Sequence, residues 1–182
     1  MTDWQQRVDA VWDAAGELGD DEVIRRIDAL AAELPADDPR ALFEQGGARD
    51  SAGLEAQAEP FYRRALELGL EGRARIELHV QLASTLRNLG RPEEAIALLD
   101  AVEPESGDLR DAVIGFRALA RVDAGDARLA ASEAVAALAG HVTQYGRALG
   151  AYARELAEGP ASRGTARHPP RANSPVRVCC TG

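Results

Sequence analysis

Three glycines recur at nearly constant spacing through the middle of the chain, and this recurrence restricts the possible folds more than any other feature. Gly53, Gly90 and Gly125 lie 37 and then 35 positions apart. Five residues after each glycine stands an alanine, at Ala58, Ala95 and Ala130. Self-similarity with a period in this range is typical of repeat architectures, in which one short structural unit is stacked on the next.

Each unit has the pattern of two helices joined by a tight turn. A glycine can adopt the left-handed backbone conformation that ends a helix, and a small residue then lets the returning helix cross closely. In the middle unit, apolar residues recur at helical spacing before Gly90, and Pro92 fits the first turn of the following helix. A single helix pair cannot bury its apolar face alone, so the pattern predicts an elongated all-α stack.

The same reasoning predicts how the chain is divided. We expect a helical repeat domain over residues 1–158, with a hairpin at 3–34, repeats at about 39–70, 75–106 and 108–139, and a capping helix at 141–157. The capping helix is expected to turn Tyr145 and Tyr152 inward. Pro60 lies beyond the first turn of a helix that starts at Glu55, which predicts a later start or a kink.

The last segment, 159–182, has a different composition. It contains four of the 21 arginines and no acidic residue, and prolines are interspersed among the arginines. Such a composition predicts a disordered Arg/Pro-rich tail. The preceding body keeps 17 basic against 30 acidic residues, a net charge of −13. The tail could be attracted to this body, although screening by salt disfavours a fixed structure.

Composition excludes several classes of function. The chain is 46% hydrophobic but only 4% aromatic, which favours closely packed helices rich in alanine and leucine. A net charge of −9 argues against a nucleic-acid partner, because binding to phosphates requires clustered basic residues. The polar N-terminus does not resemble a signal peptide, and no apolar run approaches membrane-spanning length. We therefore expect a cytoplasmic protein without a membrane partner.

No motif for catalysis, cofactor binding or metal binding is evident. The histidines, His79, His141 and His168, are scattered over different units without carboxylate or cysteine neighbours at ligand spacing. Cys179 and Cys180 stand side by side near the end of the sequence and cannot supply a four-ligand site by themselves. Serine-centred elbows and phosphate loops are also missing. The sequence predicts a protein that is not an enzyme and has no cofactor or metal.

The order of small and large residues from Gly53 to Ala65, and again from Gly90 to Val102, resembles the tetratricopeptide repeat. The strings at 62–70 and 82–91 are similar to the bacterial tetratricopeptide repeat group 5 family, and the resemblance extends over roughly 35–156. It implies a right-handed α-solenoid of stacked antiparallel helix pairs, with an inner groove lined by the first helix of each pair. It implies no defined enzymatic activity.

Transfer of the repeat pattern assigns a set of groove-facing side chains in these first helices. They are Arg40, Phe43, Asp50, Glu77, Gln81, Ser84, Arg87, Asn88 and Phe116. Polar side chains on a rigid concave face suit the backbone and the carboxylates of an extended peptide. An alternative for Arg87 and Asn88 is that they only solvate or cap the end of a helix.

Three functions follow from this interpretation. The first is a scaffold that binds a protein or a peptide in the groove. The second is a structural module that self-associates into a homodimer, in which case exposed Trp4 and Trp12 would lie at the interface. The third is a small-molecule sensor with a site between hairpins, for which the sequence offers no motif.

Overall fold

The computed structural model describes residues 3–159, and over this range the only regular secondary structure is helical. The helices are α1 Trp4–Asp13, α2 Ala15–Leu18, α3 Asp20–Ala31, α4 Pro39–Ser51, α5 Glu55–Glu67, α6 Gly72–Asn88, α7 Pro92–Val102, α8 Arg110–Asp123, α9 Ala127–Ala139 and α10 Gly146–Glu158. Two short 3₁₀ turns, Glu103–Glu105 and Gly107–Leu109, connect α7 to α8. The all-α prediction is confirmed. The tail predicted at 159–182 lies, apart from Gly159, outside the described residues.

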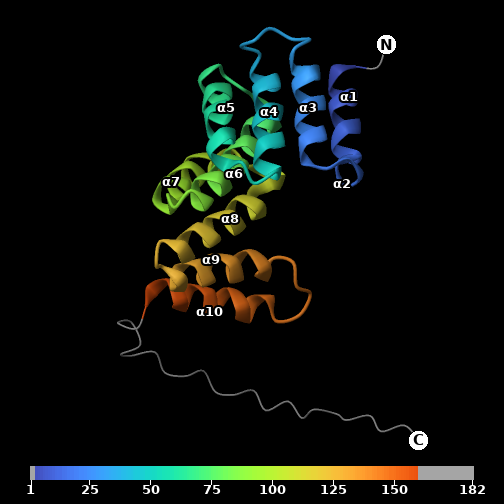
Figure 1. Cartoon of the computed structure of the whole chain (residues 1–182). Coiled ribbons are helices and arrows are strands. Elements are labelled where there is room, and N and C mark those ends of the chain that lie inside the picture. The colour runs from blue at the N-terminus through green and yellow to red at the C-terminus, as the bar shows by residue number, and fades with distance from the viewer. Residues whose placement is uncertain (1–2, 160–182) are drawn as a thin grey trace, which may run out of the picture.

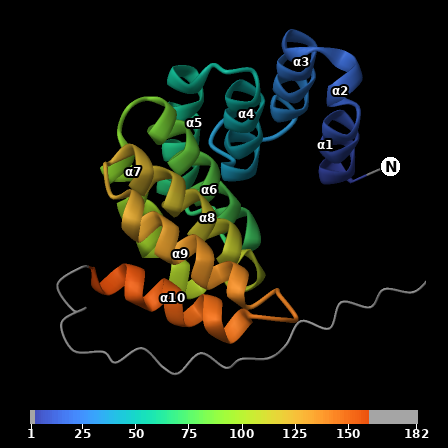
Figure 2. The ribbon, with the colours of Figure 1, turned by 90° about the horizontal axis from the view of Figure 1, so that it is seen from below.

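The helices pack in the order in which they occur along the chain (Figure 1). From α3 to α10 each helix contacts the next one, and α4, α6 and α8 also contact one another in succession. This pattern places α4, α6 and α8 in one layer, and α3, α5, α7 and α9 in a second layer. The helix axes turn from one end of the stack to the other, so that α10 lies across the direction of α4 (Figures 1 and 2).

The three glycines form equivalent turns between paired helices. Gly53, Gly90 and Gly125 all have positive φ, at 70°, 77° and 87°. In each turn the residue after the glycine donates its backbone N–H to the carbonyl five residues earlier, at 2.8–2.9 Å. This is the hydrogen bond of a Schellman motif, which ends a helix and reverses the chain. The periodic glycines therefore mark three copies of the same helix–turn–helix unit.

The small residues after these glycines are buried as the pattern requires. Ala58 and Ala95 are fully buried, and Ala130 is 3% exposed. The large residue four positions further on is also fully buried in the first two units, as Tyr62 and Leu99. In the third unit the corresponding Ala134 is exposed. The third copy is thus degenerate in packing as well as in sequence.

Helices α4 and α5 cross closely at Gly46. A Cβ atom at Gly46 would lie 2.6 Å from Cδ1 and 2.7 Å from Cε1 of Tyr62, whose side chain is fully buried. The ring of Phe43 lies 6.2 Å from the Tyr62 ring, centroid to centroid. The glycine thus allows an aromatic side chain from α5 to pack directly on the backbone of α4.

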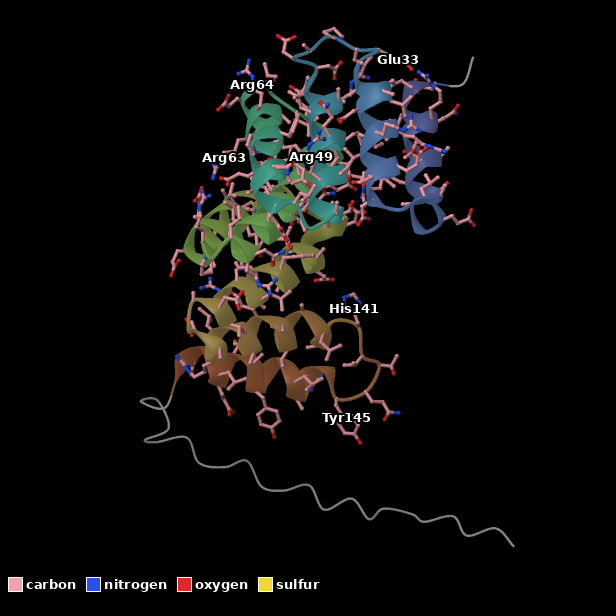
Figure 3. The ribbon with its side chains drawn as sticks, in the orientation of Figure 1. Glu33, Arg49, Arg63, Arg64, His141 and Tyr145 are labelled. Carbon is pink, nitrogen blue, oxygen red and sulfur yellow. The ribbon has the colours of Figure 1, made fainter. Side chains whose placement is uncertain are left out.

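The N-terminal hairpin has its own apolar cluster, centred on Val8, Val23 and Ile27. Ala41 and Ala48 of α4 pack in the same cluster, and Arg49 of α4 adds a polar contact. The guanidinium of Arg49 donates two hydrogen bonds to Asp28 of α3, at 2.9 and 3.1 Å, and lies 4.5 Å from the centroid of the Phe61 ring on α5. This contact spans three consecutive helices, and the labelled side chain can be followed in Figure 3.

Two predictions about helix boundaries are corrected by the structure. The last helix begins at Gly146 and not at His141, because Tyr145 takes a left-handed conformation with φ of 65°. Tyr145 is 80% exposed and points away from the stack (Figure 3). Tyr152 is 61% exposed, so the prediction that both tyrosines point inward is wrong. Helix α5 starts at Glu55 and includes Pro60, which rules out the later start, while the alternative of a kink at Pro60 stays a prediction.

Among the described helices, none is both long enough and apolar enough to span a membrane.

Candidate functional site

A hollow of about 520 Å³ opens between α1, α4 and α6, and we call it the inner hollow. Helices α4 and α6 belong to the same layer, and α1 extends this layer at the N-terminal end. The lining residues are Gln5, Asp9, Trp12, Phe43, Glu44, Gly47, Asp50, Ser51, Glu77, Gln81, Ser84 and Asn88. Most of these side chains are polar, and only Trp12 and Phe43 contribute large apolar groups.

The absence of a side chain at Gly47 shapes the floor of the inner hollow. A Cβ atom at this position would lie 3.4 Å from the Trp12 ring and 3.6 Å from Oε1 of Gln81. The glycine therefore leaves room for the indole from α1 and the amide from α6 to approach α4 from two sides. Any side chain longer than a methyl group would fill the floor between them.

A polar network lies beneath the floor and holds α4, α5 and α6 together. The Thr85 hydroxyl donates to Oδ1 of Asp50 at 2.8 Å, and the Tyr62 hydroxyl donates to Oε1 of Gln81 at 2.8 Å. Thr85 and Tyr62 are both fully buried. Because buried polar groups are costly unless they are paired, this network fixes the positions of Asp50 and Gln81 at the surface of the inner hollow.

Glu44 is the most desolvated carboxylate of the inner hollow. Burial raises the pKa of Glu44, and repulsion from Asp9 and Glu77 raises it further. Trp12 opposes this shift by donating its indole N–H to Glu44 at 2.7 Å. Burial likewise raises the pKa of Asp50, against the stabilising hydrogen bond from Thr85. Burial thus disfavours the ionised forms of Glu44 and Asp50.

A second hollow adjoins the first and shares Gln5, Phe43, Glu44 and Glu77 with it. Its remaining lining includes Arg40, whose guanidinium pairs with Asp38 and lies 5.6 Å from the centroid of the Trp4 ring. The two hollows together form a continuous groove along α4 and α6.

The structure brings together six of the nine groove residues predicted from the sequence. Phe43, Asp50, Glu77, Gln81, Ser84 and Asn88 line the inner hollow. Arg40 lines the adjoining hollow. Arg87 forms an ion pair with Asp123 on α8, and Phe116 packs against the central apolar core, so neither lines a hollow described here. Asn88 also donates to Glu55 at 3.2 Å. Their part in binding stays a prediction.

Six other lining residues are not among these nine: Gln5, Asp9 and Trp12 on α1, and Glu44, Gly47 and Ser51 on α4. The N-terminal hairpin agrees poorly with the repeat pattern, and therefore no groove positions were transferred to it. A signal was nevertheless present, because Gln5, Asp9 and Trp12 follow one another at spacings of four and three and must share one face of a helix.

The two tryptophans do not support the predicted homodimer interface. Trp4 is 9% exposed, packs in the N-terminal apolar cluster and donates its indole N–H to the Leu30 carbonyl at 2.9 Å. Trp12 is partly buried, with its own N–H bonded to Glu44. Both rings are therefore engaged within the chain, Trp4 in the core and Trp12 in the inner hollow.

Within residues 3–159, no three His, Cys, Asp or Glu side chains are arranged so that they could hold a metal ion. His79 is buried, and its Nδ1 lies 2.7 Å from the Arg75 carbonyl. Burial lowers the pKa of His79, so the ring is held in its neutral form as a packing residue.

Comparison with known proteins gives one family. The family model described as "Tetratrico peptide repeat" matches residues 39–156, which is more than half of the chain. The matched range begins with α4 and ends within α10. Comparisons with curated proteins and with solved structures found no match.

Proposed function

The chain belongs to the tetratricopeptide-repeat family, and we propose from this that it is a non-catalytic scaffold that holds a protein or peptide partner in the inner hollow. Domains of this family generally mediate contacts between proteins, and the family is typically non-catalytic. The observation that carries the proposal is the hollow itself, which lies between helices that occupy the same layer of the stack.

The lining suits a peptide in an extended conformation. Gln81, Ser84 and Asn88 lie on one face of α6 at spacings of three and four residues, so their amides and hydroxyl form a row. Such groups can pair with the backbone N–H and C=O groups of an extended chain, which repeat along its length. The network beneath Gln81 and Asp50 holds part of this surface in place before a ligand arrives, which reduces the entropic cost of binding.

A peptide-display selection on the full chain would test this proposal. Ser84→Phe fills the inner hollow with an aromatic ring, whereas Ala97→Phe adds the same ring to an exposed position on α7 in the other layer. We expect the wild-type chain and Ala97→Phe to retain the selected peptides, and Ser84→Phe to bind them at least tenfold more weakly. Unfolding curves of both variants provide the check that the fold is intact.

Two results would reject the proposal. One is a selection that enriches no peptide. The other is a set of peptides that Ser84→Phe binds as tightly as Ala97→Phe does, because those peptides must then contact another surface.

A further inference from the structure

The charge of the inner hollow is one-sided. Its lining includes the carboxylates of Asp9, Glu44, Asp50 and Glu77 and no basic side chain. Asp9, Glu44 and Asp50 lie on two helices, α1 and α4, that are distant in sequence and brought together by the fold. The hollow is therefore a concave surface with four acidic groups.

The carboxylates of the inner hollow differ from several partly buried acids of the stack. Arginines from neighbouring helices neutralise those acids, as Arg91 does for Glu59 and as Arg117 does for Glu103 and Glu133. In the described part of the chain, no arginine lies within ion-pair distance of Asp9, Glu44 or Asp50, while Glu77 is paired with Arg73 at 2.7 Å. Three of the four charges are thus not compensated by an arginine of the described stack.

A cation in the inner hollow would relieve this arrangement. Glu44 is opposed by the like charges of Asp9 on α1 and Glu77 on α6, and its burial weakens its hydration. An incoming guanidinium or ammonium group would replace repulsion with attraction, and the burial of Glu44 reduces the screening of that attraction by water. The partly buried ring of Trp12, which lines the same hollow, can add a cation–π attraction to a guanidinium.

We propose that the inner hollow selects a basic partner, namely an extended segment of another protein that carries at least two arginine or lysine side chains. The inference rests on the proposed peptide-binding function and adds the chemistry of the ligand. Asp9, Glu44 and Glu77 receive the cationic side chains, and the amides of Gln81 and Asn88 pair with the peptide backbone.

The adjoining hollow does not oppose this charge preference. Its arginines are already paired, Arg40 with Asp38 and Arg73 with both Glu77 and Asp108. A basic segment that extends from the inner hollow along α4 would therefore meet neutralised arginines and the apolar side chains of Phe43 and Leu70.

The chain's own residues 160–182 are a competing occupant, since they carry Arg163, Arg167, Arg171 and Arg177. The segment begins after α10, at the opposite end of the stack from α1 (Figure 1). A segment of a separate molecule does not have to reach from the end of α10 to the inner hollow, and such a segment is the proposed occupant.

The test is fluorescence anisotropy with three labelled ten-residue peptides of one Gly/Ser framework that carry three arginines, three glutamines or three glutamates. The full chain is titrated as wild type, as the double variant Asp9→Asn/Glu44→Gln and as the control Glu93→Gln/Asp21→Asn. The control removes the same total charge from exposed positions on α7 and α3. We expect the arginine peptide to bind at least tenfold more tightly than the other two, and the hollow variant to lose at least tenfold in affinity while the control changes less than twofold.

Each other outcome contradicts the inference in a distinguishable way. Equal binding of the three peptides, or equal loss in both charge variants, would show that the hollow does not select cations. If display-selected neutral or acidic peptides are lost with Ser84→Phe, the peptide-binding function stands and the basic partner is rejected. If replacement of the four tail arginines by glutamine tightens arginine-peptide binding fivefold or more, the chain's own tail is the occupant.

Discussion

Replacement of Gly46 by alanine tests the helix crossing on which the first repeat depends. The new Cβ atom would lie 2.6 Å from the ring of Tyr62, a contact that requires one of the two groups to shift. Tyr62 has little freedom to move, because its side chain is fully buried and its hydroxyl is bonded to Gln81. Gly46→Ala should therefore force α4 and α5 apart.

The magnitude follows from two opposing effects. Overpacking of a core by one methyl group costs about 1–3 kcal/mol. Alanine in place of glycine in a helix interior stabilises by about 1 kcal/mol. Gly115→Ala in α8 isolates the second effect, since a Cβ atom there has no neighbour within 4 Å. The two variants should thus differ by about 2 kcal/mol, or roughly 4–8 °C in Tm for a chain of this size.

Urea and thermal unfolding followed by circular dichroism would measure both variants against the wild type. Gly115→Ala should unfold at a higher temperature than the wild type, and Gly46→Ala well below Gly115→Ala. In a Tyr62→Leu background the clash is relieved, so Gly46→Ala should approach the behaviour of Gly115→Ala. If Gly46→Ala raises Tm in the wild-type background as much as Gly115→Ala does, the described packing of Tyr62 on α4 is wrong.

Two further substitutions probe buried polar groups, each by unfolding experiments. Arg117→Ala removes the arginine, 7% exposed, that Glu103 and Glu133 share, and should lower the free energy of unfolding by about 3 kcal/mol. Arg64→Ala breaks an exposed ion pair and should lower it by less than about 0.5 kcal/mol. Similar losses in the two variants would contradict this prediction. Thr85→Val removes the donor to Asp50 and should cost about 1–3 kcal/mol at pH 7, with Thr85→Ser as the control that keeps the hydroxyl. Burial raises the pKa of Asp50, and the hydrogen bond from Thr85 stabilises the ionised carboxylate. The loss of unfolding free energy caused by Thr85→Val should therefore shrink as the pH falls from 7 towards 4 and Asp50 becomes protonated. A loss that grows in acid would refute the hydrogen bond between Thr85 and an ionised Asp50.

The sequence predicted the fold well where packing is dictated by local chemistry. The helix reversals were predicted from Gly53, Gly90 and Gly125, because glycine adopts positive φ without the steric cost that other residues have. The close helix crossings were predicted from Ala58 and Ala95, because a small side chain lets two helices approach each other. The terminal helix was predicted less accurately, because its apolar periodicity continues through residues that the structure places in a loop. Periodicity shows which side chains could share a face and does not show where a helix begins.

The candidate site was predictable to the extent that it lies on the repeated first helices. Six of the residues transferred from the repeat pattern line one hollow, although the contribution of α1 was missed. That omission affects the chemistry most. Without Asp9 and Trp12 the predicted groove contained Arg40 and Arg87 and suited a peptide carboxylate. With α1 in place, the inner hollow has four acids, and both arginines are paired elsewhere.

If the groove takes a basic partner as proposed, the first helix contributes to that preference, although it lies outside the range that matches the family. Residues 39–156 supply the stack, the floor of the hollow and the row of amides on α6. Helix α1 supplies Asp9, one of the like charges that oppose Glu44, and the indole that bonds Glu44 and holds it in place. Since charges at a binding face act mainly on partner choice, two members of the family with the same stack could bind different partners by differing only in the helix that precedes it.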